Sequence, residues 1–331
     1  MRDITVAVLG ATGAVGREML KVLCERGLPP ENIIPLAGAR SAGSVIECGG
    51  ARLAVRETNE DAFRGADFVL GAAEAEVSRR FAPHIAAAGA VYIDNSSAFR
   101  LREDVPLVVP EINGADARSH RGIIANPNCS TIITMLALAP IARISPIEEI
   151  YAATYQAVSG AGEGGIRELR EQLSAASEGR ETPPRVFPAP IAMNVIPFIG
   201  AQTDNGFTDE EMKMQNEGRR ILHAPGLRVC CTCVRVPVLR SHSIAVTVRT
   251  RGIVTVEQAE RALRGAPGCR LADGERPWPT PLDVVGDDVV TVGRIRRDPC
   301  CERGLALWCC GDQLRRGAAG NAVGILQMLC A

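Results

Sequence analysis

The chain has 331 residues, with 37 Lys and Arg against 38 Asp and Glu, and only 4% of its residues are aromatic. Charges of both signs are interspersed, so we expect no nucleic-acid or anionic-membrane partner, and the scarcity of aromatic residues argues further against base stacking. No apolar stretch reaches the ~18 residues that span a bilayer, and the first residues lead into a strand pattern without a signal peptide, so we expect a cytoplasmic protein.

The first predicted strand covers residues 4–9 and ends in a glycine turn, which a helix pattern over residues 17–24 follows. This order of strand, glycine turn and helix predicts a dinucleotide-binding site. Gly10 permits the tight turn, Gly13 lets a pyrophosphate approach the backbone, and Gly16 permits close packing of helix on strand. The spacing is a G-x-x-G-x-x-G variant, so a generic glycine-rich turn is the alternative.

A second predicted strand, residues 33–37, is followed by Arg40 and Ser41 rather than by an acidic residue. An NAD-preferring site usually carries Asp or Glu here for the ribose hydroxyls, whereas a cation and a hydroxyl suit a 2′-phosphate. We therefore predict NADP as the cofactor. A solvated loop arginine is the alternative.

Further strand patterns alternate with helix patterns such as residues 77–88, and they cover residues 68–70, 90–94, 107–109 and 122–125. Such alternation predicts an α/β fold with a mostly parallel, doubly wound sheet of the Rossmann type. Ligands bind at the carboxyl edge of these sheets, so the segment after the last strand is a candidate site.

Cys129 follows that last strand, in the sequence Asn-Pro-Asn-Cys-Ser-Thr at residues 126–131. The Asn and Pro residues resist helix formation, whereas the apolar run at residues 132–141 favours it, so we expect Cys129 at the turn into a helix. Unpaired N–H groups and the positive end of the helix dipole favour the reactive thiolate at such a position. A buried core cysteine is the alternative, because Cys is among the most buried residue types.

Beyond residue 148 the pattern changes to longer β-prone runs, at residues 149–157, 229–238, 244–256 and 305–310. These runs predict a second, α+β domain with an open, mixed sheet. A proline-rich loop is expected at residues 183–197, and a closing helix that packs on the first domain at residues 314–329.

The chain is long enough for two domains that each bury a core. We place the nucleotide-binding domain at residues 1–129, closed by the helix at residues 314–331, and the second domain at residues 130–313.

His242 lies between two strand-like runs, with Arg235 and several hydroxyl groups nearby in the sequence. Imidazole shuttles protons near neutral pH, which a thiol-based acyl transfer requires. A histidine in a surface turn is the alternative. Gln156 ends a strand before a glycine-rich turn, where its amide either orients a substrate or nucleophile or is an ordinary strand-end group.

A capping box predicts a helix that starts after Thr208, with Glu211 three residues on. Glu210 and Lys213 share one face of this helix, where a solvated ion pair is the alternative to a functional pair. Arg100 follows a strand of the first sheet and is a candidate to meet an anionic group near the thiol.

The 12 cysteines are expected to be thiols rather than a disulfide framework in a cytosolic chain. Several are adjacent in strand-like runs, where neighbouring side chains point to opposite faces. We therefore expect no metal site.

Seven motifs occur in order along the chain, at residues 10–13 (Gly-Ala-Thr-Gly), 96–100 (Ser-Ser-Ala-Phe-Arg), 109–113 (Val-Pro-Glu-Ile-Asn), 126–129 (Asn-Pro-Asn-Cys), 235–238 (Arg-Val-Pro-Val), 292–296 (Val-Gly-Arg-Ile-Arg) and 315–319 (Arg-Arg-Gly-Ala-Ala). By this ordered set the chain resembles the bacterial aspartate-semialdehyde dehydrogenases over essentially its whole length.

The resemblance implies reductive dephosphorylation of L-4-aspartyl phosphate by NADPH to L-aspartate 4-semialdehyde, in the biosynthesis of lysine, threonine, methionine and diaminopimelate. It implies that Cys129 is the nucleophile that forms a thioester, Gln156 its orienting partner and His242 the general acid/base. It also implies a homodimer built through the second domain.

The same resemblance implies the binding residues. Arg235 would bind the substrate α-carboxylate and Glu210 its α-amino group, while the phosphate would be held by Arg100, Lys213 and Asn128. The residues implied for NADP binding are Gly10, Thr12, Gly13, Ala14, Val15, Arg40, Ser41, Ser159, Gly160 and Asn321.

Two other activities and one non-catalytic role are alternatives. A reductase of N-acetyl-glutamyl phosphate shares the chemistry, but its acetylated substrate gives Glu210 no ammonium partner. Malonyl-CoA reduction is a second alternative of the same type. The third is a non-catalytic homologue that binds a nucleotide or a protein partner, which the joint presence of Cys129, His242 and Arg235 argues against.

Overall fold

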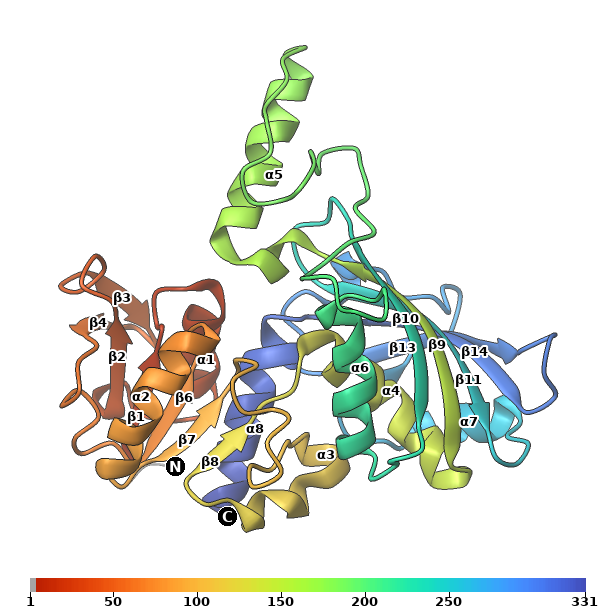
Figure 1. Cartoon of the computed structure of the whole chain (residues 1–331), viewed down its shortest axis with the longest axis horizontal. Helices are drawn as coiled ribbons and strands as arrows, with labels where there is room; N and C mark the ends of the chain where they lie inside the picture. Colours follow the sequence, from red (N-terminus) through yellow and green to blue (C-terminus); the bar gives the residue numbers. More distant parts are fainter. Residues whose placement is uncertain (1–3) are drawn as a thin grey trace. The chain divides into compact units, whose positions relative to one another are not determined.

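The computed structural model describes residues 4–331, so residues 1–3, on which the signal-peptide prediction partly depends, lie outside the described part. The chain folds into two compact units (Figure 1). The first comprises the residues up to Asn128 together with Ala318–Ala331, and the second comprises Cys129–Gly317.

The first unit contains a six-stranded sheet in the order β5-β2-β1-β6-β7-β8, in which every pairing is parallel. The strands are β1 (Val6–Leu9), β2 (Ile33–Ala37), β5 (Arg56–Glu57), β6 (Phe68–Gly71), β7 (Val91–Asp94) and β8 (Ile123–Ala125). Because β1, β2 and β6 are buried along nearly their whole length, they consist of continuous apolar residues. The predicted doubly wound sheet is confirmed.

Helices accompany this sheet, and their apolar faces form one core with the strands. Helix α8, at the end of the chain, packs against α1 and β7, and α2 also packs against β7. The helical elements are α1 (Ala14–Glu25), α2 (Ala75–Ala87), α3 (Pro110–Asn113), α8 (Gly320–Leu329), η1 (Pro30–Asn32) and η2 (Gly114–Ser119).

Three features of this unit differ from the sequence predictions. The expected strand at residues 107–109 makes only an isolated bridge, from Leu107 to Ala125. A hairpin of β3 (Val45–Cys48) and β4 (Ala51–Ala54) is absent from the sequence predictions, although β3 alternates exposed and buried residues and the two strands are joined by a Gly-Gly turn. The sequence predicts thiols rather than a disulfide framework, and ten cysteines are thiols, but Cys24 and Cys48 form a disulfide between α1 and β3.

The second unit contains a mixed sheet in the order β10-β9-β11-β14-β13-β12, with parallel pairings at β10/β9 and β12/β13 and antiparallel pairings elsewhere. The predicted mixed sheet is confirmed. The strands are β9 (Ile147–Gln156), β10 (Arg228–Arg235), β11 (His242–Thr250), β12 (Cys269–Leu271), β13 (Val290–Arg297) and β14 (Gly304–Gly311).

Three helices, α4 (Cys129–Ile144), α6 (Asp209–Ile221) and α7 (Val256–Arg264), cover one face of this sheet (Figure 1). Helix α4 is apolar all round because residues 130–141 are buried between the sheet and its neighbours. The remaining elements are α5 (Gly162–Ser177), η3 (Val158–Ala161), η4 (Pro281–Val284) and the π-helical turn η5 (Arg315–Ala319).

The β-prone run at residues 244–256 is not a single strand. β11 ends at Thr250, and α7 begins at Val256 behind a capping box formed by Thr255 and Gln258. Such a cap contributes about 1 kcal/mol to a helix end, which outweighs the β preference of one half-buried valine, Val256.

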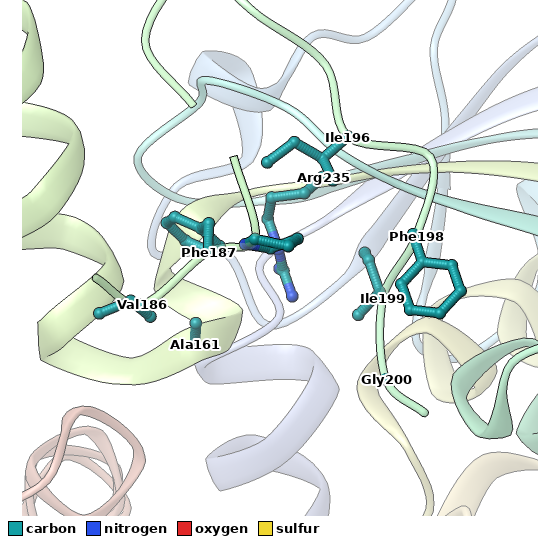
Figure 2. A pocket seen from close by; sticks show the side chains of 9 residues that line it. Ala161, Val186, Phe187, Ile196, Phe198, Ile199, Gly200 and Arg235 are labelled. Atoms are coloured by element: carbon teal, nitrogen blue, oxygen red, sulfur yellow. The ribbon is translucent and has the colours of Figure 1, made fainter. Parts of the chain in front are cut away.

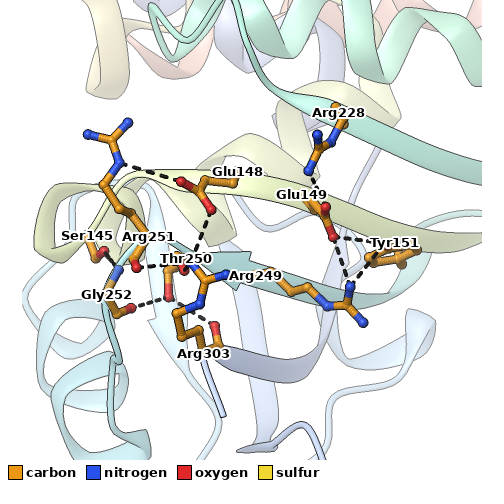
Figure 3. Close-up of polar contacts among 10 residues, drawn as sticks. All are labelled: Ser145, Glu148, Glu149, Tyr151, Arg228, Arg249, Thr250, Arg251, Gly252 and Arg303. Atoms are coloured by element: carbon orange, nitrogen blue, oxygen red, sulfur yellow. Dashed lines mark hydrogen bonds and ion pairs between the residues drawn. The ribbon is translucent and has the colours of Figure 1, made fainter. Parts of the chain in front are cut away.

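An ion-pair network ties the beginning of β9 to the adjacent strands (Figure 3). Glu149 accepts hydrogen bonds from Tyr151 at 2.8 Å and from Arg249 at 3.1 Å and pairs with Arg228. Solvent screens surface pairs of this kind, so they fix register more than they stabilise the fold. The opposite end of β9 carries Gln156, seven residues from Glu149 and therefore about 23 Å away at the usual rise of about 3.3 Å per residue.

Candidate functional site

The glycine turn of the first unit has the geometry that the sequence predicts. Gly10 has a φ of +85°, and a Cβ atom there would lie 2.7 Å from the Ala72 carbonyl oxygen. A Cβ atom on Gly16 would overlap the Gly10 carbonyl oxygen, so only glycine lets α1 start this close to β1. The turn therefore requires Gly10 and Gly16, whereas a Cβ on Gly13 meets nothing closer than 3.5 Å.

The start of α1 is open to an anion. Its N-cap is Gly13, so no side chain caps the backbone N–H groups that begin with Ala14 and Val15. Thr12, just before the cap, is half-buried, and its carbonyl oxygen accepts a hydrogen bond from Arg17 at 3.0 Å. Uncapped N–H groups at a helix start, with glycine in place of side chains, suit a pyrophosphate.

Arg40 and Ser41 lie in the loop after β2, beside this turn. β2 is the parallel neighbour of β1, and the N–H groups of Gly10 and Ala11 both donate to the Leu36 carbonyl oxygen at 2.9 Å. The Arg40 side chain is exposed and Ser41 is half-buried. A cation and a hydroxyl are therefore available at the sheet edge where the ribose of a dinucleotide lies.

Three asparagine side chains form a chain of hydrogen bonds in the first unit. Asn126 donates to Asn95 at 2.7 Å, and Asn321 of α8 donates to Asn126 at 2.7 Å and to the Val108 carbonyl at 2.9 Å. Asn321 is fully buried, and its Oδ1 atom has no hydrogen-bond partner among residues 4–331. A buried acceptor left unsatisfied costs about 1–3 kcal/mol, so this atom marks a place for a donor from a ligand.

Arg100 is held by main-chain carbonyl groups of the same region. Its Nε donates to the Asn126 carbonyl at 3.0 Å and its Nη2 to the Asn95 carbonyl at 2.6 Å. The loop that carries it is anchored by Asp94, a fully buried carboxylate that accepts hydrogen bonds from Ser96 and Ser78. The guanidinium is thus directed by backbone carbonyl groups, and Arg100 as a whole is only 8% exposed.

Cys129 begins helix α4 in the second unit, as the sequence predicts, and it is half-buried. Gly317 in the π-helical turn η5 packs against it, because a Cβ atom on Gly317 would lie 3.0 Å from the Cys129 Cβ. Asn128, the residue before the thiol, is 8% exposed. The thiol therefore has the electropositive helix start that favours a thiolate.

The strand pairing brings Gln156, Arg235 and His242 to one end of the second sheet. β10 runs parallel to β9 and pairs Arg235 with Gln156. β11 runs antiparallel to β9 and pairs Ser243 with Tyr155, so His242, the first residue of β11, lies beside the point where β9 ends. His242 is therefore a strand residue rather than part of a surface turn, and all three side chains are at most 7% exposed.

The backbone of Ala157 links two of these side chains. Its N–H donates to Nδ1 of His242 at 3.0 Å, and its carbonyl oxygen accepts from Nη1 of Arg235 at 2.7 Å. Gly160 lies against both, since a Cβ atom on it would lie 2.8 Å from Arg235 Nη1 and 3.5 Å from His242 Nε2. Ser159 is buried and accepts a hydrogen bond from Gln313.

His242 is fully buried, and its Nε2 has no hydrogen-bond partner among the described residues. Burial, and then the charge of Arg235, lower the pKa of His242 to about 3, although Glu210 acts in the opposite direction. The ring is neutral at physiological pH. Because Nδ1 accepts a hydrogen bond, its single proton is on Nε2.

Glu210 and Lys213 join this group from helix α6, which starts with the predicted capping box of Thr208 and Glu211. Gln156 Nε2 donates to Glu210 Oε1 at 3.2 Å, and Lys213 Nζ donates to Glu210 Oε2 at 2.8 Å. The two charged side chains are only 10% and 23% exposed. The pair is therefore packed against a strand end rather than solvated.

Arg235 also forms part of the wall of a cavity of about 460 Å³ (Figure 2). Its guanidinium carbon lies 5.8 Å from the ring centre of Phe187. Burial lowers the pKa of Arg235 below its usual value, and the charges of Glu210 and Cys129 offset only part of this effect. The other lining residues are mostly apolar, namely Ala161, Val186, Pro188, Ile196, Phe198, Ile199 and Gly200.

The second unit thus brings together Gln156, Glu210, Lys213, Arg235 and His242, and the charge of Cys129 acts on Arg235. Ser159 and Gly160 belong to the same unit. Arg100, Asn128, Asn321 and the glycine-turn residues belong to the first unit.

Three residues of the site, Ala157, Gly317 and Phe187, were not predicted from the sequence. Ala157 acts through its backbone, and Phe187 comes from the proline-rich loop, so neither carries a local signal. Gly317 lies in the motif at residues 315–319, but no local pattern distinguishes it from the other small residues there.

Two family models match the chain, a semialdehyde dehydrogenase NAD binding domain over residues 5–120 and a semialdehyde dehydrogenase dimerisation domain over residues 138–316. An aspartate-semialdehyde dehydrogenase of Synechocystis sp. is 46% identical over 328 residues, covering 98% of this chain and 97% of that protein. One from Bacillus subtilis is 44% identical, covering 99% and 98%. A solved structure, aspartate semialdehyde dehydrogenase II of Vibrio cholerae complexed with ASA, has a TM-score of 0.97 at 43% identity and covers 100% of this chain and 99% of that one.

Proposed function

The chain belongs to the aspartate-semialdehyde dehydrogenase family, and we propose that it reduces L-4-aspartyl phosphate to L-aspartate 4-semialdehyde with NADPH, releasing phosphate. The product serves the biosynthesis of lysine, threonine, methionine and diaminopimelate. The observation that carries the proposal is that His242 and Arg235 are both hydrogen-bonded to Ala157, next to Gln156. A proton-carrying imidazole and a carboxylate-binding guanidinium on one backbone segment suit acyl transfer from an amino-acid substrate.

Cys129 is the nucleophile in this proposal. Its thiolate attacks the carbonyl carbon of the acyl phosphate, the bond from that carbon to the phosphate oxygen breaks, and phosphate leaves with the electron pair. The start of α4 favours the thiolate, and the neighbouring Arg235 charge adds to that effect. The result is a thioester, which accepts hydride better than a carboxylate does.

NADPH, when bound, supplies that hydride. The Nε2–H of His242 donates a hydrogen bond to the thioester oxygen as negative charge develops there. The resulting tetrahedral oxyanion re-forms its C=O bond as the C–S bond breaks, which releases the semialdehyde and returns the thiolate of Cys129. The neutral ring is suited to this role because Ala157 occupies Nδ1 and leaves Nε2 as the atom without a partner in the described chain. A donor of this kind contributes about 2.7–4 kcal/mol to transition-state stability elsewhere.

We base the proposed substrate recognition on the charged side chains at this end of the second sheet. Arg235 binds the α-carboxylate, and Glu210 binds the α-ammonium and so distinguishes a free amino acid from an N-acetylated one. Gln156, hydrogen-bonded to Glu210, orients the substrate against the thiol. Lys213, Arg100 and Asn128 hold the phosphate group.

The cofactor of this proposal is NADP. The uncapped start of α1 at Gly13 would hold the pyrophosphate, and Arg40 with Ser41 would hold the 2′-phosphate. Asn321 Oδ1 would accept a hydrogen bond from the carboxamide N–H of the nicotinamide, since this buried atom has no partner among residues 4–331. The further residues assigned to NADP are Gly10, Thr12, Ala14, Val15, Ser159 and Gly160.

The protein is also proposed to form a homodimer through the outer face of the second sheet. That face presents Tyr151, 42% exposed, and Tyr155, 39% exposed, whose ring lies 5.4 Å from the ring of Trp308. Helices α4, α6 and α7 cover the opposite face. Aromatic side chains gathered on a sheet face are typical of a subunit interface, and the dimerisation-domain match includes these strands.

The test is phosphate-dependent formation of NADPH from aspartate semialdehyde and NADP. We expect turnover only when phosphate is present, slower turnover with NAD, and none with N-acetyl-glutamate semialdehyde or with malonate semialdehyde and coenzyme A. Cys129→Ala should abolish turnover while NADPH binding is unchanged. An active Cys129→Ala variant, or a parent that turns over none of these substrates, would refute the assignment.

A further inference from the structure

We infer that Thr154 is a positioning residue for the proposed reaction, and that its hydroxyl holds the Gln156 amide in the orientation that presents its Nε2 to Glu210 and to the substrate. Thr154 itself contacts neither substrate nor cofactor in the mechanism above. The inference depends on the proposed function only in that Gln156 must contact the substrate.

Thr154 and Gln156 lie on the same face of β9. Residues two apart on a strand point the same way, and both side chains lie on the inner face, at 0% and 2% exposure, with Tyr155 on the outer face between them. The Thr154 hydroxyl donates to Gln156 Oε1 at 3.0 Å. The hydroxyl lies on a face whose earlier member, Ile150, is apolar and fully buried, so its hydrogen bond is what offsets its burial.

The second contact of Gln156 determines which side-chain atom is the amide nitrogen and which is the amide oxygen. Its Nε2 donates to Glu210 Oε1 at 3.2 Å, and a carboxylate only accepts hydrogen bonds. The amide oxygen must therefore be the atom that faces Thr154, and the hydroxyl must be the donor. Thr154 holds the amide oxygen and Glu210 holds the amide nitrogen, so the amide cannot rotate. The second N–H of Nε2 therefore points in one fixed direction.

The orientation matters because Glu210 is also held by Lys213 at 2.8 Å. The hydrogen bonds run from Thr154 through Gln156 to Glu210, so the hydroxyl on β9 acts on the carboxylate of α6 through one amide. Without the hydroxyl, Oε1 is a buried acceptor with no partner. The amide then rotates away from Glu210, and the group that orients the substrate loses its fixed geometry.

The experiment is a double-mutant cycle in the assay with aspartate semialdehyde, phosphate and NADP. Thr154→Val removes the hydroxyl at nearly constant volume, Gln156→Ala removes the amide, and Thr154→Ser keeps a hydroxyl as the matched control. We expect Thr154→Val to lower kcat/KM about tenfold, mainly through kcat, and Thr154→Ser to stay within about threefold of the parent. In the Gln156→Ala background, Thr154→Val should change kcat/KM by less than about twofold.

Independent, multiplied effects of the two substitutions would overturn the inference, as would a Thr154→Val variant with parental kinetics. Melting temperature and NADPH binding are measured for each variant, and Thr154→Ala takes the place of Thr154→Val in the same cycle if the valine variant does not fold. Failure of the proposed function has a different signature, because the parent itself would then lack phosphate-dependent turnover.

Discussion

The N–H of Ala157 donates a hydrogen bond to Nδ1 of His242 at 3.0 Å. An atom that accepts from an N–H must present its lone pair, so the neutral imidazole carries its proton on Nε2. A doubly protonated ring would direct an Nδ1–H at the Ala157 N–H inside a buried site. The backbone contact therefore sets the tautomer of His242, while burial and the charge of Arg235 lower its pKa and make the ring resist protonation.

This resistance predicts a pH-dependent cost to stability. The pKa of His242 is about 3 in the folded protein and about 6.5 in the unfolded chain, so the unfolded state binds the proton more tightly. Above pH ~6.5 neither state is protonated and His242 has no effect; as the pH falls from ~6.5 towards 3, stability is lost. At pH 5 the parent should have lost about 2 kcal/mol relative to His242→Gln.

Urea unfolding of the parent and of His242→Gln, at pH 7.5 and at pH 5, measures this difference. Comparing the two proteins at each pH cancels the contributions of all other titrating groups. If the free-energy gap between them is the same at both pH values, His242 is not held in its neutral form by the fold.

Gly160 is predicted to leave the space that the Arg235 guanidinium needs to reach Ala157. A methyl group there would lie 2.8 Å from Arg235 Nη1, so Gly160→Ala should displace the guanidinium from Ala157 and raise the KM for aspartate semialdehyde about tenfold or more. Gly226→Ala is the matched control, since a Cβ atom at Gly226 meets nothing within 4 Å. An unchanged KM for Gly160→Ala would mean that Arg235 does not bind the carboxylate from this position.

Arg40 is predicted to confer the preference for NADP. Arg40→Ala should raise the KM for NADP about tenfold and leave the KM for NAD nearly unchanged, because only NADP carries the 2′-phosphate. Arg64→Ala, which removes an exposed arginine paired with Asp61, is the control for a loss of net positive charge. Equal effects of Arg40→Ala on both cofactors would contradict the assignment.

The outer face of the second sheet is predicted to be the dimer interface. Tyr155→Arg places a charge beside Trp308 and should convert the dimer to a monomer, measured by light scattering during size-exclusion chromatography. Val45→Arg is the control, since it charges an exposed apolar residue of the β3 hairpin in the first unit. A Tyr155→Arg protein of parental mass would exclude this face.

Much of the fold could be predicted because its signals are local. β2, which is buried along its length, appears as a continuous apolar run, and the capping box at Thr208 marks the start of α6. The same kind of signal was present at Thr255 and Gln258, where it overrides the β-prone residues that precede α7. The β3–β4 hairpin carries a local signal as well, the Gly49-Gly50 turn with positive φ at both residues, which the sequence predictions did not use.

The residues of the site also fall into those that local sequence patterns predict and those that they do not. Cys129 and the glycine turn could be found from the strand-to-helix patterns around them. The contacts made by Ala157 and Gly317 could not, because the first uses backbone atoms and the second depends on the absence of a side chain. The pairing of Thr154 with Gln156 required the strand register and the position of Glu210 on a different element.

The central claim is that Cys129 forms a thioester with the aspartyl group. It is tested by mixing the protein with aspartate semialdehyde and NADP in the absence of phosphate. We predict a burst of one NADPH per subunit, with an aspartyl group found by mass spectrometry on the peptide that contains Cys129 and released when phosphate is added. A protein that gives no burst, or that carries the aspartyl group on another residue, would contradict the account.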